Sequence, residues 1–468
     1  MNSEAKIIPE NSHRFRQGER EMLFHVPSSS VFELEAEAAN LLTGLEQSAP
    51  APLAGADSDL NETLEDLKRL QIIARDNRPA VTPSLDKLQQ IPLSTLVLNV
   101  NTGCNLSCSY CYKEDLDKPA DSKRMALETA QKAIEMMLQE SPDQPRYNIV
   151  FFGGEPLTNM PLIREVVDYA ENRFGRLGRP VDFSLTTNAT LLNPEIVEFL
   201  QAHRIGVAVS IDGPQAIHDK NRITVGGQGT YAVVRRKVDY LLEHYTARPV
   251  GARVTLTKGV TNVEQIWDHL FNEIGFDEVG FAPVTSGDIA YYNLSELELQ
   301  QVFDNMKALG QRYIDAACGH RNIGFSNFHQ ILTDIHEGTK KALPCGAGAG
   351  MVAIDHSGGV NLCHRFTGSE LPLFGSVTEG LDTAGLADFL AQRLDRTDKG
   401  CSSCWIRNLC SGGCYHESYA RYNDPQRPTY HYCDLMRDWI DFALQGYAQI
   451  MQDNPAFIDT YIAPRRGR

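Results

Sequence analysis

Three cysteines in one short loop have a spacing that could carry metal chemistry. Cys104, Cys108 and Cys111 follow the pattern C-x3-C-x2-C and supply three thiolates from one segment. Thiolates are the usual ligands of iron–sulfur clusters, and three of them leave one corner of a four-iron cubane open for a small molecule. Zinc is the competing interpretation, but structural zinc needs four protein ligands, and no fourth Cys or His follows nearby. The spacing favours an iron–sulfur cluster.

Most of the remaining cysteines gather near the C-terminus. They are Cys345, Cys363, Cys401, Cys404, Cys410, Cys414 and Cys433. The total of eleven is odd, so complete pairing in disulfides is impossible, and no apolar signal-peptide segment is visible. Metal or redox chemistry is the leading explanation, and metal coordination would stabilise a segment that is rich in loops. Cys318 stands alone near the end of a predicted helix, where a buried, inert thiol is expected.

Several polar and glycine residues lie where predicted strands end. They are Gly153, Gly154, Glu155, Asn188, Ser210, Asp212 and, slightly later, Arg222. Taken alone, Gly-Gly is an ordinary strand-to-helix turn, and an Asn or Gly at these positions can simply serve a turn. Arg222 is either a carboxylate clamp or a solvated surface charge. These residues become informative only through the scaffold that positions them.

The sequence between residues 91 and 294 predicts that scaffold. Six apolar or β-branched runs alternate with helical segments. The runs are Leu96–Val100, Asn148–Phe152, Asp182–Thr186, Val207–Ile211, Ala252–Thr257 and Glu278–Ala282. Strands that alternate with helices indicate a parallel sheet with right-handed crossovers, so an α/β barrel, complete or partly open, is expected. Chemistry in such folds lies at the carboxyl ends of the strands, where these motifs fall.

The flanking regions differ in character. Residues 1–90 predict a small α+β unit with strands Met22–Val26 and Val31–Leu34, which is either a packing module or a partner-binding module. Residues 295–344 predict a helical linker that opens with a capping box at Ser295. Residues 345–468 form the cysteine-rich region and end in a helix near Leu435–Met451.

The cysteine loop, with Tyr110 directly before its third cysteine, resembles the radical SAM superfamily. The resemblance implies a partial (β/α)6 barrel and a [4Fe-4S] cluster whose open iron binds S-adenosylmethionine (SAM), giving a 5′-deoxyadenosyl radical. Phe151–Pro156 is similar to the family's GGEP motif, in which Glu155 would receive the methionine ammonium of SAM. Contacts with the cofactor are implied for Tyr110, Gly153, Gly154, Glu155, Asn188, Ser210, Asp212 and Arg222. Asp212 is also the candidate catalytic base.

The C-terminal cysteines resemble the SPASM extension of peptide-modifying radical SAM enzymes. That resemblance implies two auxiliary [4Fe-4S] clusters, and therefore three clusters in all. The outer cluster would be held by Cys401, Cys404, Cys410 and Cys433, and the inner cluster by Cys345, Cys363 and Cys414. The fourth site of the inner cluster would be empty, filled by a non-cysteine ligand, or bound by a substrate thiolate.

The order of the pieces is similar to that in the thioether-forming maturases of quinohemoprotein amine dehydrogenases. The N-terminal unit resembles a winged-helix peptide-recognition domain, which would add a substrate strand at Leu23–Val26 or Val31–Leu34. The resemblance implies Cys-to-Asp/Glu thioether bonds in a small Cys-containing partner, the amine dehydrogenase γ-subunit, and an electron donor such as flavodoxin or ferredoxin. The alternatives are formylglycine formation, as in anaerobic sulfatase maturases, and a non-catalytic iron–sulfur scaffold that binds a peptide.

Composition limits the other function classes. The chain of 468 residues has a net charge of −16, which argues against nucleic acid as a partner because that affinity depends on Lys and Arg. Its mean hydropathy is −0.30, and no run of about 18 apolar residues occurs, so no membrane span is expected. Without a visible signal peptide, a cytoplasmic location is expected.

Overall fold

The computed structural model describes residues 6–47, 58–74, 92–112, 122–284, 291–395, 400–427 and 431–463, with backbone only at 58–61. Its centre is a sheet in which six parallel strands follow one another in chain order. They are β6 (Thr95–Asn99), β7 (Tyr147–Phe152), β8 (Val181–Thr187), β9 (Gly206–Ser210), β10 (Gly251–Leu256) and β11 (Glu278–Pro283). Each strand lies within a residue or two of its predicted position.

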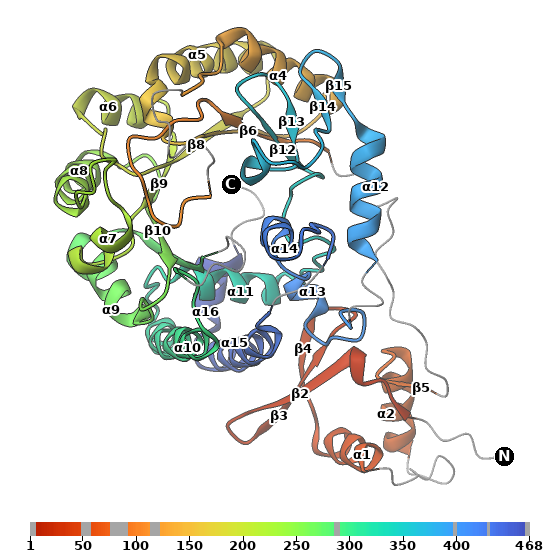
Figure 1. Cartoon of the computed structure of the whole chain (residues 1–468). Helices are drawn as coiled ribbons and strands as arrows, with labels where there is room; N and C mark the ends of the chain where they lie inside the picture. The colour runs from red at the N-terminus through yellow and green to blue at the C-terminus, as the bar shows by residue number, and fades with distance from the viewer. Residues whose placement is uncertain are drawn as a thin grey trace.

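Helices cover the outer face of these strands (Figure 1). They include α4 (Leu127–Glu140), α5 (Met160–Leu177), α6 (Pro194–Ala202), α7 (Gln215–Asn221), α8 (Tyr231–His244) and α9 (Val263–Trp267). In α5 the buried residues Ile163, Val166, Val167 and Ala170 repeat every three or four positions, which gives the helix one apolar face for the sheet. The predicted partial barrel is confirmed.

The cysteine-rich region extends the barrel sheet. Strand β12 (Met351–Ile354) pairs in parallel with β6, and β13 (Val360–Asn361) pairs antiparallel with β12. The chain then turns across the carboxyl end of β6, where the Asn99 side chain donates a hydrogen bond to Thr367 Oγ1 (2.9 Å). This pairing brings the segment around Cys363 to the barrel mouth, beside the loop that follows β6.

The N-terminal unit is a three-stranded antiparallel sheet with helices. The strands are β2 (Ser12–Gln17), β3 (Arg20–His25) and β4 (Ser30–Glu33), followed by α1 (Ala36–Glu46) and α2 (Ser58–Arg69); β1 (Lys6–Ile7) pairs with β5 (Ile73–Ala74). The two predicted strands are present as β3 and β4. Because β3 lies between β2 and β4, only the Val31–Leu34 candidate adjoins an edge where a strand could be added.

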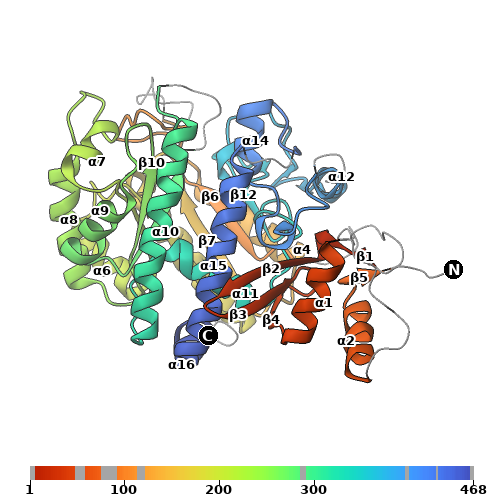
Figure 2. The ribbon, with the colours of Figure 1, turned by 90° about the horizontal axis from the view of Figure 1, so that it is seen from below.

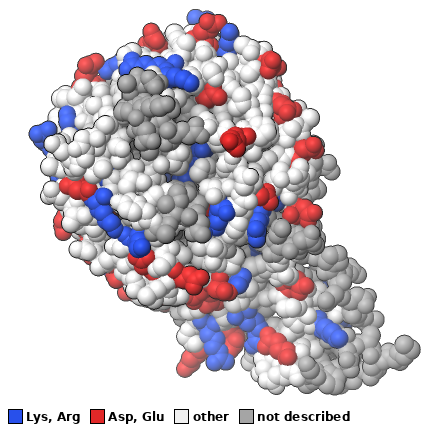
Figure 3. Space-filling view, in the orientation of Figure 1, with Lys and Arg blue, Asp and Glu red and all other residues white. Residues whose placement is uncertain are grey.

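Long helices join the N-terminal unit to the barrel. Helix α10 (Glu296–Cys318) begins with the predicted capping box, is followed by α11 (Ser326–His336), and packs against α15 (Cys433–Asp453). Strand β2 lies along α15 (Figure 2). On the face seen in Figure 3, acidic and basic side chains of the described residues are interspersed. None of the described helices is long and apolar enough to cross a membrane.

Candidate functional site

The loop with Cys104, Cys108 and Cys111 is held against the end of helix α7. The Ser109 amide donates to the carbonyl of Asn221 (3.0 Å), and the Ser109 hydroxyl contacts the Asn221 side chain (2.6 Å). Burial raises the pKa of the Cys104 thiol to about 12 and that of Cys108 to about 11. A metal centre would displace these protons, since thiolates are the ligating form.

The Gly153-Gly154 pair holds the same loop from the other side. A Cβ on Gly154 would lie 2.0 Å from the carbonyl oxygen of Gly103, and one on Gly153 would lie 2.3 Å from the Asn101 side-chain oxygen. The Glu155 amide also donates to the Gly103 carbonyl (3.1 Å). The two glycines are therefore required by the close approach of the β7 turn to the cysteine loop, a constraint within the protein itself.

The Glu155 carboxylate is buried at the ends of β7 and β8. It accepts hydrogen bonds from Thr187 Oγ1 (2.7 Å), the Asn188 amide (2.7 Å) and the Leu157 amide (3.1 Å). Burial raises the pKa of Glu155 to about 7, against the opposing effect of these hydrogen bonds. A cationic group in the adjoining cavity would favour the ionised form, which fits the ammonium contact expected from the sequence.

Asn188 connects the end of β8 to the cysteine loop. Its Nδ2 atom lies 3.8 Å from Cys104 Sγ and donates to the Asn105 side-chain oxygen (3.0 Å). Its Oδ1 atom accepts from the hydroxyl (2.6 Å) and amide (3.0 Å) of Thr190. Asn188 therefore does more than form a turn, because it orders the loop at its first cysteine.

A buried ion pair supports the other side of the site. Arg222 Nε lies 3.0 Å from the Asp212 carboxylate, which also accepts hydrogen bonds from the Tyr110 hydroxyl (2.7 Å) and the Thr255 amide (3.1 Å). Arg222 is thus a buried carboxylate clamp, and the carboxylate is that of Asp212. These contacts hold Arg222 and Tyr110 in place through the Asp212 carboxylate. The catalytic-base role of Asp212 stays a prediction from the sequence.

One cavity of about 200 Å³ joins these groups. Among the sequence-predicted residues it is lined by Cys104, Cys108, Tyr110, Cys111, Gly153, Gly154, Glu155, Asn188, Ser210 and Arg222, and Asp212 stands behind this lining. The other ten lining residues were not predicted as site residues, and they include Tyr112, Phe152 and Arg365. The only signal for them was position, since Tyr112 follows Cys111 and Arg365 lies two residues after Cys363.

The structure brings the C-terminal cysteines together in two groups. The pKa of Cys363 is raised to about 12, chiefly by burial and in smaller part by the charges of Cys414 and Cys345, so these three thiols are neighbours. Burial likewise raises the pKa of Cys410 to about 11, with added contributions from Cys404, Cys433 and Cys401. Cys318 lies apart from both groups, with its Sγ atom 3.8 Å from an Asp453 carboxylate oxygen.

The cysteine arrangement is compatible with iron–sulfur clusters. Within the described residues, no three His, Cys, Asp or Glu side chains converge closely enough to hold one metal ion. A cubane has one thiolate on each iron and so spreads its ligands more widely than a single ion does. The three thiols around the shared cavity fit a cluster with one open position.

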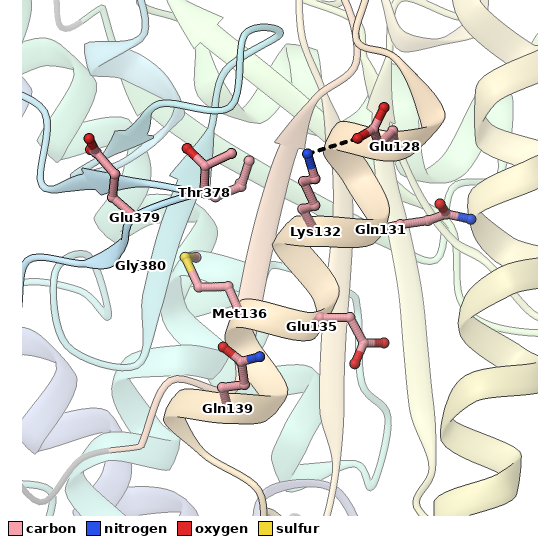
Figure 4. Close-up of a pocket in the computed structure, with 10 residues that line it drawn as sticks. Glu128, Gln131, Lys132, Glu135, Met136, Gln139, Thr378, Glu379 and Gly380 are labelled. Atoms are coloured by element: carbon pink, nitrogen blue, oxygen red, sulfur yellow. Dashed lines mark ion pairs between the residues drawn. The ribbon is translucent and has the colours of Figure 1, made fainter.

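A larger cavity lies elsewhere on the surface. A pocket of about 500 Å³, open to solvent, lies between α4 and the hairpin of β14 (Gly375–Ser376) and β15 (Gly380–Leu381). Figure 4 shows its polar lining, in which Lys132 pairs with Glu128 (2.8 Å). No cysteine lines it. The chemistry of the lining therefore identifies the smaller cavity as the candidate site.

Comparison with known proteins identifies relatives of the barrel region. Residues 98–271 match the Radical SAM superfamily. The radical SAM cyclopropyl synthase TigE of Paramaledivibacter caminithermalis is 26% identical over 375 residues, which cover 74% of this chain and 72% of that protein. A cysteine-type anaerobic sulfatase-maturating enzyme of Clostridium perfringens is 23% identical over 75% of this chain and 96% of its own length. An uncharacterised protein of Methanocaldococcus jannaschii is 33% identical over 187 residues, 39% of this chain, and the match spans only 61% of that relative.

Solved structures share the fold. Native anSMEcpe with bound AdoMet superposes with a TM-score of 0.61 at 19% identity and covers 79% of this chain and 99% of its own. Streptococcus suis SuiB bound to precursor peptide SuiA gives a TM-score of 0.50 at 17% identity and covers 92% of this chain and 99% of its own. Residues 98–271 of this chain therefore form a radical SAM domain, homologous to the corresponding domain of peptide- and sulfatase-maturing enzymes.

Proposed function

We propose that this protein is a radical SAM enzyme that forms Cys-to-Asp/Glu thioether cross-links in a small partner protein, the γ-subunit of an amine dehydrogenase. The observation that carries the proposal is the shared cavity. The three thiols of the loop after β6 line it, and so does Arg365, which lies two residues from the inner-group cysteine Cys363. A substrate in this cavity would lie beside the three loop thiols and beside the segment that carries Cys363.

The residues present fit the cofactor that this chemistry needs. Cys104, Cys108 and Cys111 would hold a [4Fe-4S] cluster, and Glu155 and Asn188 would bind SAM beside it. When bound, this pair supplies a 5′-deoxyadenosyl radical that removes a hydrogen atom from the substrate. Leu106, Phe152 and other apolar lining residues restrict water in the cavity, which protects reactive species from side reactions.

The inner cysteine group supports a role for a substrate thiol. Cys345, Cys363 and Cys414 supply three thiols, and none of the other eight cysteines belongs to this group in the sequence pattern. An auxiliary cluster held by three protein thiolates has room for a fourth, which the substrate cysteine would provide. Bond formation would then remove one hydrogen atom, one proton and one electron from the substrate for each C–S bond.

The N-terminal unit would recognise the partner. Strand β4 is an edge of its sheet, and Phe32 on that strand is 41% exposed. An extended peptide can pair with such an edge and place alternate side chains on the surface. The structure of SuiB with its precursor peptide shows that a protein of this fold binds a peptide. A flavodoxin or ferredoxin would serve as electron donor.

Mass spectrometry of a co-expressed partner tests the proposal. The small Cys-containing protein encoded beside this chain should lose two hydrogens per cross-link, and the cysteines involved should resist alkylation. Anaerobically reconstituted enzyme with SAM and dithionite should release 5′-deoxyadenosine, and its absence would exclude the enzymatic interpretation in favour of a scaffold.

Formylglycine formation is the second candidate. The match to the Clostridium perfringens enzyme, over 96% of its length, favours it. That reaction would leave a hydrazide-reactive aldehyde in the partner and no cross-link. The same mass-spectrometric experiment therefore distinguishes the two functions.

A further inference from the structure

Arg365 belongs to the cysteine-rich region and lines the cavity of the candidate site. It lines the cavity together with the three thiols of the loop after β6. Its guanidinium carbon lies 4.5 Å from the ring centroid of Tyr112, the residue that follows Cys111. The Arg365 side chain therefore brings a cation from the segment of Cys363 to the cavity that the loop thiols line.

The Tyr112 ring that contacts this cation is itself held by neighbouring rings. Its ring also contacts the ring of His416 (5.5 Å between centroids), and His416 is 8% exposed and packs against Phe366. Stacking on an aromatic ring fixes the plane of a guanidinium, and its N–H donors point outward in that plane. Two N–H groups of a guanidinium held in this way can donate to the two oxygens of one carboxylate.

The other charged residues of the cavity come from the barrel, away from the cysteine-rich region. Arg222 faces Asp212 at 3.0 Å, and the Glu155 carboxylate accepts three hydrogen bonds from its own loops. Arg365 differs because it approaches from the region that carries the inner cysteines. Its position suits a ligand that lies in the cavity on the side of the Cys363 segment.

We propose that Arg365 binds the carboxylate of an acidic side chain on the peptide substrate and so selects Asp or Glu for modification. This inference rests on the proposed function, and it adds the group that the enzyme recognises at the reacting residue. Holding the carboxylate fixes the neighbouring methylene in the cavity, which is where hydrogen abstraction would occur. The methionine part of SAM also carries a carboxylate that could bind Arg365, and the experiment below distinguishes the substrate carboxylate from that of SAM.

The binding experiment uses two small probes that differ in one group. N-acetyl-aspartate N′-methylamide and N-acetyl-asparagine N′-methylamide are titrated against reconstituted protein with SAM, and affinity is followed by saturation-transfer NMR. The unmodified protein should bind the acidic probe at least fivefold more tightly. Arg365→Gln should remove the preference, and Arg365→Lys should keep part of it because the charge remains but the planar fork is lost.

Arg427→Gln is the matched control, because Arg427 also stacks on a tyrosine (4.2 Å from the Tyr422 ring) but does not line the cavity. It should leave the preference unchanged. Iron content and the visible spectrum of each variant establish that the clusters have assembled. Deuterium transfer from a Cβ-deuterated acidic probe to 5′-deoxyadenosine should fall at least tenfold in Arg365→Gln.

Four results would overturn the inference. They are equal affinities for the two probes in the unmodified protein, a preference that survives in Arg365→Gln, no deuterium transfer from the acidic probe to 5′-deoxyadenosine, and a tenfold loss of SAM affinity in Arg365→Gln. The last would assign Arg365 to the cofactor carboxylate. None of these measurements requires a C–S bond, so failure to detect thioethers would reject the proposed function and leave the result on acidic recognition standing.

Discussion

At the scale of single residues, Gly154 decides whether the cysteine loop can reach its position. The Cβ of an alanine there would lie 2.0 Å from the Gly103 carbonyl, which is backbone and cannot rotate away. One of the two loops must then shift, at a cost of about 3 kcal/mol or more. Gly154→Ala should therefore incorporate much less iron at this loop, measured by iron analysis after reconstitution.

Gly175 provides the control for that substitution. It lies inside α5, and no atom within 4 Å would meet its Cβ. Gly175→Ala should keep the full iron content and raise stability by up to about 1 kcal/mol, because alanine favours the helix. Equal iron loss in both variants would show that the contact with Gly103 is not the reason.

Glu155 should make the stability of the metal-free, SAM-free protein depend on pH. Its pKa is raised from 4.5 to about 7 by burial, so between these values the folded state binds more protons than the unfolded state. The free energy of unfolding should therefore fall as the pH rises from about 5 to 7, by roughly 1.4 kcal/mol per unit at most. Above pH 7 this dependence should end.

Glu155→Gln removes the titrating group and is the comparison that isolates it. Denaturant unfolding of both proteins at several pH values between 5 and 8 would show whether their difference changes with pH. The variant should lack the downward slope. A constant difference would mean that Glu155 stays in one protonation state, and the raised pKa would then be wrong.

At the scale of elements, the N-terminal sheet is attached to the segment that carries the outer cysteines. The His13 ring on β2 stacks on Trp405, directly after Cys404, with 3.7 Å between centroids, and its Nε2 atom lies 2.5 Å from an Asp441 carboxylate oxygen on α15. Arg407 adds a hydrogen bond to the Asn11 side chain (3.0 Å). A well-ordered backbone around Cys404 should therefore require the N-terminal sheet to be packed against it, and the packing of the sheet should require that ordered backbone.

Substitution of His13 tests this dependence. His13→Ala removes the stack on Trp405 and the hydrogen bond with Asp441 together, so amide exchange in β2 and in the first turns of α15 should become faster, measured by hydrogen–deuterium exchange. Chelation of iron from the unmodified protein should have the same effect. His203→Ala is the control, because His203 pairs with Glu171 (2.9 Å) on the outside of the barrel. Unchanged exchange in β2 would exclude the coupling.

The elements also show what the sequence can predict. The six barrel strands were found because each is a compact apolar run between turns. Strand β2 was missed because, of its six residues, only Phe15 is buried. Strand β12 was missed because four residues are a weak signal, and its partner β6 lies about 250 positions earlier in the chain. Arg365 was missed for the same reason, since its place in the cavity depends on that long-range pairing.

At the scale of the whole molecule, the N-terminal sheet belongs to two cores. Leu23 on β3 packs with Leu42, Leu64 and other residues of the N-terminal helices. Its neighbour Phe24 faces the opposite way and belongs to the large core that contains the barrel strands. Alternate side chains of one strand thus connect the N-terminal unit to the rest of the protein. The N-terminal region should therefore unfold together with the barrel.

Two phenylalanines on adjacent strands test this last point. Phe24 is fully buried, so Phe24→Ala should lower the stability of the whole molecule by about 3–5 kcal/mol and shift a single calorimetric transition. Phe32 on β4 is 41% exposed, so Phe32→Ala should leave that transition in place and instead weaken binding of the partner peptide. A separate low-temperature transition in Phe24→Ala, with the barrel transition unchanged, would mean that the N-terminal unit is an independent domain. In that case peptide binding at β4 could not be transmitted to the cavity through a shared core, and a flexible tether would have to bring the substrate there.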